Sequence, residues 1–346
     1  MHEKHSTLPG AESAATECGS TQAGARGRIG AYLALAKARL SALVVMTTLA
    51  GFLLASEGAA GHAGWWRLIW TLIGTALAAG GANALNQWME RRVDARMERT
   101  RGRPLPAGQL SPQQALRWAV TVSLAGVLIL ALFVNLLTAS LALFVILLYL
   151  LVYTPLKARS PLCTIVGAVC GAVPPMMGFT AVTGQLSPGA WILGAILFIW
   201  QIPHFLSLAI LYRDDYARGG LRMLPVVEHS CRSTCRMIVL YSLALIPAGL
   251  ALTLSGHAGW IYAVGSIVLG SAMVAGALNL YFQRTRHNAR RLFFASLAYL
   301  PLLLILMAAN PGPPAPAMAG GSMVQAEISS EEWWGEPLDG RPTSGR

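Results

Sequence analysis

Nine apolar runs, each about long enough to cross a bilayer, constrain this chain more than any other feature. The hydrocarbon core of a membrane is ~30 Å thick, and a helix crosses it with roughly 20 apolar residues. The runs are approximately Leu33–Ala55, Leu68–Trp88, Trp118–Val134, Leu136–Tyr153, Cys163–Val182, Gly189–Leu211, Met237–Ser255, Gly259–Phe282 and Leu292–Ala309. Hydrophobic residues make up 55% of the chain and charged residues 12%, too few polar groups to cover a soluble protein. The sequence therefore predicts an all-α polytopic membrane protein with nine transmembrane helices.

The third and fourth runs are separated by little more than Asn135. Such a short connection leaves the chain room only to reverse direction. We therefore expect these two helices to form a tight antiparallel pair.

The basic residues fall almost entirely on one side of the predicted bundle. Of the 26 Lys and Arg residues, 23 lie in the N-terminal segment with the start of the first run, or in the loops after the second, fourth, sixth and eighth runs. The other three are Arg67, Arg341 and Arg346. By the positive-inside rule this predicts a cytoplasmic (inner) membrane protein with a cytoplasmic N-terminus and an external C-terminus. The formal charge of +11 is then a topology signal, and no nucleic-acid partner is expected.

The runs define one domain with a polar segment at each end. Residues 1–29 lack the apolar core of a signal peptide and are predicted to be a disordered cytoplasmic segment. Residues 30–309 are predicted to form the nine-helix domain. Residues 310–346, which begin rich in Pro and Gly and contain Trp333 and Trp334, are predicted to be a disordered external tail.

Charge concentrates where the second run ends. Asn86, Glu90 and Asp94 are four residues apart, so on a helix each advances ~40° around the axis and ~6 Å along it, and all three share one face. Oxygen ligands without a nearby His or Cys suit Mg²⁺. Arg99 and Arg103, which follow, are of the residue type that grips phosphate with two hydrogen bonds. The cluster predicts a site for a metal and a phosphate.

A structural interpretation of the same carboxylates remains open at this point. On a solvated helix Glu90 and Asp94 would pair with the arginines beside them in sequence. These arginines are Arg91, Arg92 and Arg96.

The sequence NQWMERRVDARMERTRGRPL, from Asn86 to Leu105, resembles the first Asp-rich signature of the UbiA-type intramembrane prenyltransferases. That signature is roughly NDxxDxxxD followed by RTxxRPL. The matching positions are Asn86, Asp94, Arg99, Thr100, Arg103, Pro104 and Leu105. Gln87 and Glu90 replace two of its aspartates. Glu90, with Met97 ahead of the RT pair, is similar to the branch of the family that farnesylates haem.

A second polar cluster follows the sixth run, at Tyr212-Arg213-Asp214-Asp215-Tyr216. Here tyrosines replace the outer aspartates of the family's second signature. The segment instead resembles the haem-farnesylating form, with its WQxPHF, KDDYxxxG and MLPV elements. The matching residues are Trp200, Gln201, Pro203, His204, Phe205, Asp214, Asp215, Tyr216, Gly219, Met223, Leu224, Pro225 and Val226.

The resemblance implies a UbiA-type bundle with its active site at the cytoplasmic helix ends. It implies transfer of a farnesyl group from farnesyl diphosphate to a vinyl group of haem b, with addition of water, giving haem O. Haem is then a substrate, since no redox or haem-attachment motif is present. The implied partners are the lipid bilayer and, among proteins, haem A synthase or terminal oxidase assembly factors.

The resemblance also assigns roles to individual residues. The catalytic set is Asn86, Glu90, Asp94, Asp214 and Asp215, of which the four carboxylates hold Mg²⁺. The diphosphate-binding set is Lys37, Arg39, Arg99, Arg103, Tyr153 and Lys157. Contacts to haem or the prenyl chain are His204, Tyr212 and Tyr216. We further hypothesise that Asp215 or a neighbour positions the water.

Some of these roles have a simpler alternative. Lys37 and Arg39 would look the same as cations that anchor a helix at the membrane surface. His204 would look the same as a histidine whose hydrogen bond is satisfied by a neighbouring helix.

Two other functions compete with haem farnesylation. A UbiA-type enzyme can act on a phenolic quinone precursor or on chlorophyllide. A transporter would also have many helices and charged loops, but here the charges cluster at helix ends on one side, without the inverted repeats of broken helices typical of carriers.

Overall fold

The computed structural model describes residues 27–56 and 62–312. Nearly all of the two segments predicted to be disordered lies outside these residues. Residues 27–29 belong to the predicted disordered segment 1–29, but in the structure they are part of a short helical stretch over 27–35. The helices that follow are α2 (Ala38–Ala55), α3 (His62–Asp94), α4 (Pro112–Phe133), α5 (Leu136–Leu147), η1 (Leu148–Tyr153), α6 (Thr154–Leu156), α7 (Cys163–Thr183), α8 (Pro188–Leu211), α9 (Arg213–Arg218), α10 (Leu224–Val227), α11 (Arg232–Leu254), α12 (Trp260–Phe282) and α13 (Arg286–Ala309).

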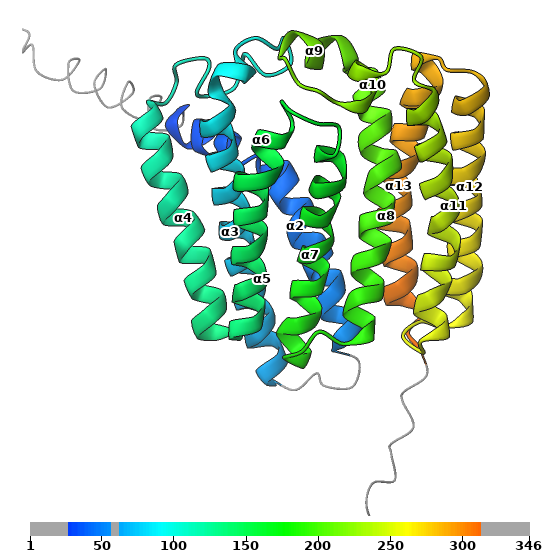
Figure 1. The fold of residues 1–346 in the computed structure, drawn as a ribbon. Coiled ribbons are helices and arrows are strands. Elements are labelled where there is room, and N and C mark those ends of the chain that lie inside the picture. The colour runs from blue at the N-terminus through cyan, green and yellow to red at the C-terminus, as the bar shows by residue number, and fades with distance from the viewer. Residues whose placement is uncertain (1–26, 57–61, 313–346) are drawn as a thin grey trace, which may run out of the picture. The chain divides into compact units, whose positions relative to one another are not determined.

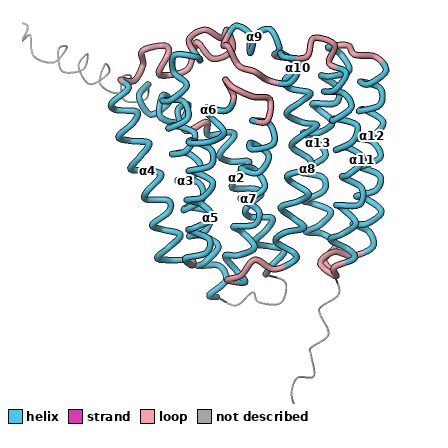
Figure 2. The backbone as a smooth tube through the Cα atoms, in the orientation of Figure 1, coloured by secondary structure: helices cyan, strands magenta, loops and turns pink. Residues whose placement is uncertain are grey.

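The all-α architecture and the nine spans are confirmed. Within residues 27–56 and 62–312, nine segments are long and apolar enough to cross a membrane, and each contains or overlaps one predicted run. Figure 2 shows that loops gather at the two ends of the bundle. Helix α3 is longer than predicted, since it continues past Trp88 to Asp94, where Met, Glu and Arg are good helix formers even after the chain leaves the bilayer. All of Asn86, Glu90 and Asp94 therefore lie on one helix.

The predicted tight pair is α4 and α5, and Asn135 joins them. Its side-chain oxygen accepts a hydrogen bond from the Thr138 N–H at 2.8 Å and caps α5. Its side-chain N–H donates to the Thr180 carbonyl of α7. The predicted fourth run then continues as α5, η1 and α6, and η1 is a π-helical segment. Such segments are frequent at functional sites, and this one precedes Lys157.

Helix α2 crosses α7 at very close range, with glycines at the contact. A Cβ atom added at Gly178 of α7 would overlap the backbone oxygen of Thr48, and one at Gly51 of α2 would overlap that of Pro175. Small residues let two helix backbones approach in this way inside a membrane. Helix α7 also contacts α8, which in turn contacts α11 and α13. These contacts join the N-terminal and C-terminal helices of the described residues.

We expect Gly178→Ala to destabilise the bundle by about 1–3 kcal/mol, because the added methyl group must push two backbones apart. Gly80→Ala is the matched control, since its added Cβ would meet only the Ala36 Cβ at 3.5 Å. The measurement is the thermal unfolding midpoint of each purified variant in detergent. Equal midpoints for the two variants would contradict the close α2–α7 contact.

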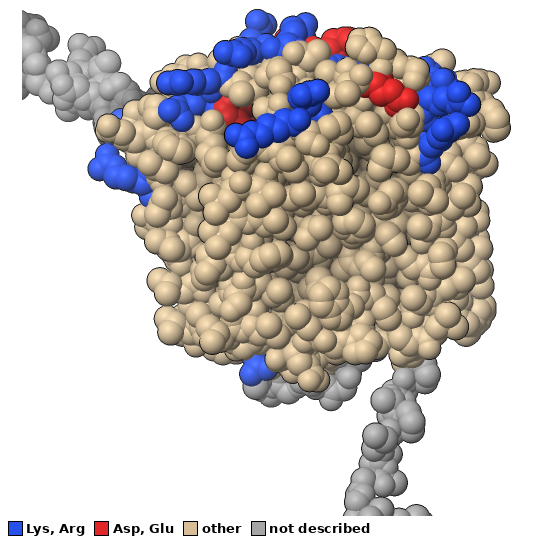
Figure 3. Space-filling view, viewed as in Figure 1, with Lys and Arg blue, Asp and Glu red and all other residues tan. Residues whose placement is uncertain are grey.

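Charged residues gather at one end of the bundle. Figure 3 shows Lys, Arg, Asp and Glu at the end that carries the loops around α9 and α10, and a largely uncharged lateral surface below it. We call this the charged end. The ends of α3, α6 and α8 all reach it, so the two polar clusters of the sequence lie at the same end.

Candidate active site

The last turns of α3 present Asn86, Glu90 and Asp94 to three cations. Asn86 accepts a hydrogen bond from Lys37 Nζ at 3.0 Å. Glu90 pairs with Lys157 at 2.9 Å, and Asp94 pairs with Arg103 at 2.7 Å. The structure therefore brings together six of the residues predicted for the site, from the start of α2, the end of α3, the following loop and the end of α6.

The alternative pairing with arginines next in sequence is not what the structure shows. Each carboxylate pairs with a cation from beyond its own helix, and neither pairs with Arg91, Arg92 or Arg96. The Glu90 and Lys157 side chains are only 12% and 15% exposed, and that of Asp94 is 1% exposed. These ion pairs are mostly buried away from water. A buried ion pair is stable only if its geometry and hydrogen bonding are good.

A helix break places Lys37. The chain is helical over 27–35 and again from Ala38, and between them Lys37 has a left-handed backbone, with φ 48° and ψ 57°. Gln87 Nε2 donates to the carbonyls of Ala34 (3.1 Å) and Leu35 (2.7 Å), just before the break. The Ala34 carbonyl also accepts from the Lys37 N–H at 3.1 Å. A non-glycine residue in this conformation costs of order 1 kcal/mol or more and is often found at functional sites.

Two contributors were missed by the sequence analysis. Gln87 stands where the family signature has an aspartate, and here it supports the break that presents Lys37. Thr154, next to Tyr153, accepts a hydrogen bond from Asn86 Nδ2 at 3.0 Å and donates to the Tyr149 carbonyl. In the sequence, the only indication of a role for either residue was that it directly follows a predicted site residue.

The two lysines of the site differ in their partners and therefore in their pKa. Burial, with the nearby Arg103 and Lys157 cations, lowers the pKa of Lys37 to about 7, because its partner Asn86 is uncharged. Burial acts in the same direction on Lys157, but the Glu90 carboxylate outweighs it and raises the pKa of Lys157 above its ordinary value. Lys157 is thus charged at neutral pH, while Lys37 titrates there.

Asp94 has a free coordination position. Its Oδ2 pairs with Arg103, but its Oδ1 is buried and has no hydrogen-bond partner among the described residues. A buried carboxylate oxygen without a partner is costly, so this atom is suited to a ligand. Mg²⁺ typically takes one or two protein carboxylates and completes its shell with water and substrate phosphates. Asp94, with Glu90 one turn away, fits that donor set.

The four predicted metal carboxylates do not form one cluster. Where the structure describes the chain, no three side chains of His, Cys, Asp or Glu lie together in a way that could hold a metal ion. Asp214 is exposed and pairs with Arg286 at 2.6 Å. Asp215 accepts hydrogen bonds from the backbone N–H groups of Glu98 and Arg99. Helix α9 therefore directs both aspartates to other partners.

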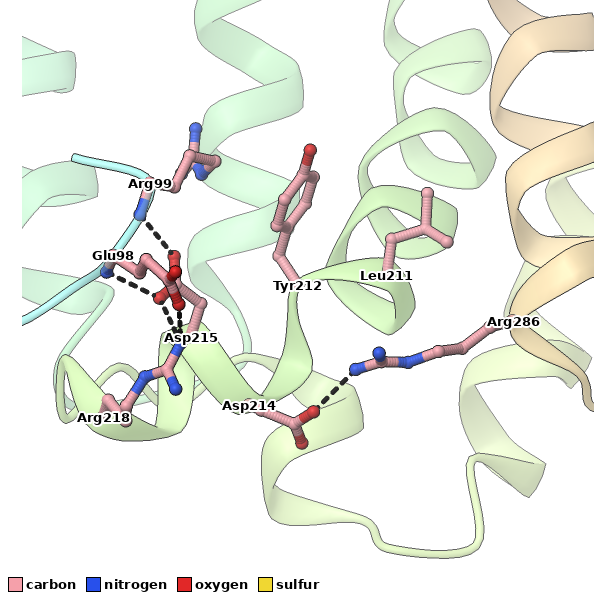
Figure 4. Close-up of a pocket in the computed structure, with 8 residues that line it drawn as sticks. All are labelled: Glu98, Arg99, Leu211, Tyr212, Asp214, Asp215, Arg218 and Arg286. Atoms are coloured by element: carbon pink, nitrogen blue, oxygen red, sulfur yellow. Dashed lines mark hydrogen bonds and ion pairs between the residues drawn. The ribbon is translucent and has the colours of Figure 1, made fainter.

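The second polar loop borders a pocket of about 400 Å³ at the charged end. Figure 4 shows its lining residues: Glu98, Arg99, Leu211, Tyr212, Asp214, Asp215, Arg218 and Arg286. The Arg99 guanidinium carbon lies 5.1 Å from the Tyr212 ring centroid and 5.9 Å from that of Tyr216, so Arg99 contacts both predicted aromatic residues. Arg39, by contrast, is exposed and joins no ion pair in the described part of the chain.

Two aromatic side chains sandwich His204 within the bundle. Its ring centroid lies 5.0 Å from that of Trp200 and 4.9 Å from that of Phe293, and both contacts are stacked. Its Nδ1 is 2.8 Å from Ser296 Oγ, which donates its proton to the Phe293 carbonyl. When Ser296 donates to that carbonyl, His204 Nδ1 carries the imidazole proton and Nε2 keeps a lone pair. The hydrogen bond to a neighbouring helix is present, and the contact with haem stays a prediction.

Comparison with known proteins identifies the family of this chain. Residues 44–300 match the UbiA prenyltransferase family. A relative named protoheme IX farnesyltransferase, from Solibacter usitatus, is 45% identical over 80% of this chain and 97% of its own length. The chain belongs to the UbiA prenyltransferase family and is a multi-pass membrane protein. The resemblance noted in the two polar loops is thereby confirmed at the level of the family.

Solved structures show the same fold. A structure described as digeranylgeranylglyceryl phosphate synthase has a TM-score of 0.69 at 13% identity and covers 81% of this chain and 97% of its own. A UbiA homologue from Archaeoglobus fulgidus, bound to DMAPP and Mg²⁺, has a TM-score of 0.56 at 14% identity, covering 80% and 99%.

Proposed function

We propose that this protein transfers a farnesyl group from farnesyl diphosphate to a vinyl group of haem b, with addition of water, giving haem O and diphosphate. Three cations, Lys37, Lys157 and Arg103, meet three polar side chains of one helix face, Asn86, Glu90 and Asp94, at the charged end. This arrangement carries the prenyl-transfer assignment. The choice of haem is supported by the name of the 45% identical relative and by the matching residues of the second polar loop.

The metal we propose is Mg²⁺, held by Glu90 and by the unpartnered Oδ1 of Asp94. When bound, it supplies Lewis-acid stabilisation of the departing diphosphate and holds it in place. The Mg²⁺ bound in the Archaeoglobus fulgidus homologue supports this choice.

The cations of the chain act on the leaving group. The bond between farnesyl C1 and the diphosphate oxygen breaks, and the electron pair leaves with the diphosphate. Lys157, Arg103 and Lys37 are preorganised donors at the place where this negative charge develops, and in a site largely without water such donors stabilise it strongly. The allylic carbocation that remains is stabilised by aromatic faces, for which we propose Tyr212 and Tyr216.

The acceptor then attacks the cation. A vinyl carbon of haem forms the new bond to farnesyl C1, and the resulting cation on the adduct takes a hydroxyl from water and releases a proton. The lone pair on His204 Nε2 is a candidate contact for the haem, because the stacked rings of Trp200 and Phe293 fix the imidazole plane. Asp94 and Glu90, paired with cations, have no role as bases in this scheme.

Lys37 gives the affinity for farnesyl diphosphate a defined pH dependence. Its pKa of about 7 means that it is protonated below pH 7 and binds phosphate there, and that the contribution fades as the pH rises through 7. A hydrogen bond from a charged donor is worth on the order of a tenfold change in affinity. Wild type should therefore exceed Lys37→Met by about that factor at pH 6 and match it by pH 8.5.

The measurement for Lys37 is calorimetric titration with a non-reactive thiodiphosphate analogue at each pH. The diphosphate itself also titrates, but it does so equally with both proteins, so the ratio of affinities isolates Lys37. A ratio that stays constant from pH 6 to 8.5 would rule out a titrating Lys37.

The choice of acceptor is tested with the purified protein, farnesyl diphosphate and Mg²⁺, offered either haem b or 4-hydroxybenzoate. We expect a product with the mass of haem O from the first mixture only. Product from the phenol alone would instead establish the alternative UbiA activity. Uptake of farnesyl diphosphate into vesicles without its consumption would indicate a transporter.

We further propose that the charged end faces the cytoplasm from the inner membrane. The excess of Lys and Arg at that end supports this orientation by the positive-inside rule. Arg67, near the start of α3, lies at the opposite end of its helix from Glu90 and Asp94.

A further inference from the structure

Two backbone N–H groups in the loop after α3 have no backbone acceptor within residues 27–56 and 62–312. Residues 97–101 form a turn in which Thr100 and Arg101 donate to the Met97 carbonyl, at 3.2 and 2.9 Å. The Glu98 and Arg99 N–H groups precede these donors in the chain, so the turn offers them no carbonyl. The first N–H groups of a helix are left free for the same reason. Such donors are ordinarily capped by a side chain immediately before them.

The cap here comes from the second polar loop. Asp215 Oδ1 accepts from the Glu98 N–H at 2.9 Å, and Oδ2 accepts from the Arg99 N–H at 3.4 Å. The Glu98 and Asp215 positions are 117 residues apart in sequence. Figure 4 shows the Asp215 carboxylate between this turn and Arg218.

The surroundings of Asp215 are consistent with a fixed contact. Its side chain is 7% exposed, and Arg218 donates to Oδ1 at 2.9 Å. Burial would raise the pKa of Asp215, but the hydrogen bonds from Arg218 and the two backbone N–H groups outweigh it and lower this pKa. A Cβ at Gly219 would lie 2.9 Å from Met97 Sδ, so the end of α9 packs directly on the turn. Neighbouring Asp214 differs, since it is 72% exposed.

The capped turn is connected to the carboxylate of the active site. Thr100 Oγ1 donates to the Asp94 carbonyl at 2.9 Å, and the Arg103 N–H donates to the Thr100 carbonyl at 3.0 Å. Arg103 then pairs with the Asp94 side chain. The turn and the Arg103–Asp94 pair are thus joined through Thr100.

We propose that Asp215 is a positioning residue, whose carboxylate caps the turn of residues 97–101 from a distant loop and so holds Arg103 on Asp94. On this view Asp215 is not a metal ligand. The catalytic part of the proposal rests on the proposed function, while the capping part does not.

Hydrogen exchange tests the cap without any substrate. The full-length protein in detergent is compared with Asp215→Ala, Asp215→Asn and Asp214→Ala, and exchange is followed by mass spectrometry in peptides that cover residues 95–103. We expect exchange at Glu98 and Arg99 to rise about tenfold or more in Asp215→Ala, less in Asp215→Asn, which keeps one acceptor oxygen, and not at all in Asp214→Ala. Unchanged exchange in both Asp215 variants would overturn the proposal.

A magnesium titration separates positioning from metal ligation. For Asp215→Asn we expect a higher KM for farnesyl diphosphate and an unchanged Mg²⁺ concentration at half-maximal rate. A rise of tenfold or more in that Mg²⁺ concentration, with exchange as in wild type, would make Asp215 a ligand. If wild type fails to farnesylate haem, the proposed function falls, but the exchange experiment still decides on the cap. If Asp215→Ala does not fold, the isosteric Asp215→Asn carries both tests.

Discussion

Replacing Asp94 by Asn is expected to lower farnesyl transfer on the order of 10³-fold, the size of effect seen when one preorganised electrostatic group is removed from a reaction centre. The Asp94 side chain is 1% exposed, pairs with Arg103 at 2.7 Å and has one oxygen for which the described residues provide no partner. Asn keeps the shape and an acceptor for Arg103 but loses the charge that a divalent cation needs. Alanine would also remove the charge, but it would leave the partly buried Arg103 with no acceptor at this position, at a greater cost to folding.

The assay for Asp94→Asn is turnover of farnesyl diphosphate and haem b at increasing Mg²⁺, with monodisperse elution as evidence of folding. Glu228→Gln is the control, since it removes another carboxylate from the charged end. Glu228 accepts the N–H groups of Ser233 and Thr234 at the start of α11, away from the α3 site. A near wild-type rate for Asp94→Asn would show that the metal-site assignment is wrong.

Lys157→Met is expected to affect stability and activity together. It leaves the Glu90 carboxylate, 12% exposed, without its cation, and breaking a buried pair in this way typically costs about 3–5 kcal/mol. It also removes a donor to the leaving diphosphate, for which we expect a loss of about 10²–10³-fold in rate. Thermal unfolding and turnover are measured on the same preparation.

The double variant Glu90→Gln/Lys157→Met separates the two effects. It has no unpaired charge, so we expect most of the lost stability to return. The activity should not return, because both the carboxylate and the cation are still missing. Recovery of activity along with stability would mean that this pair has only a structural role.

The spans were predictable because hydrophobic length and helical periodicity are local properties of a sequence. The run from Leu136 to Tyr153 needed only its own apolar residues to be recognised, and Asn135 needed only its position between two runs. The shared face of Asn86, Glu90 and Asp94 follows from a spacing of four on a helix. The helix itself continued six residues beyond the predicted end at Trp88.

The partners of these residues could not be predicted in the same way. Glu90 and Lys157 are 67 residues apart, and Lys37 and Asn86 are 49 apart. Their meeting depends on how α2, α3 and α6 pack, and on a left-handed residue at position 37 that no propensity favours. Asp214 and Asp215 are adjacent in sequence, and both were predicted to bind the metal. In the structure Asp214 pairs with Arg286 of α13, whereas Asp215 accepts from the backbone N–H of Glu98.

By itself, then, the sequence determined nine runs long and apolar enough to cross a membrane, the gathering of most basic residues on one side of them, and the resemblance of two polar loops to those of UbiA prenyltransferases. The spans depend on the hydrophobicity and length of each segment, and the shared helix face depends on residue spacing, so both can be read from short stretches of sequence. Only the tertiary structure decided which cation neutralises each carboxylate, which carboxylate oxygen stays free, and that Asp215 bonds to backbone N–H groups. Ion pairs and hydrogen bonds act over about 3 Å, and contacts of that length between distant segments exist only once the helices have packed.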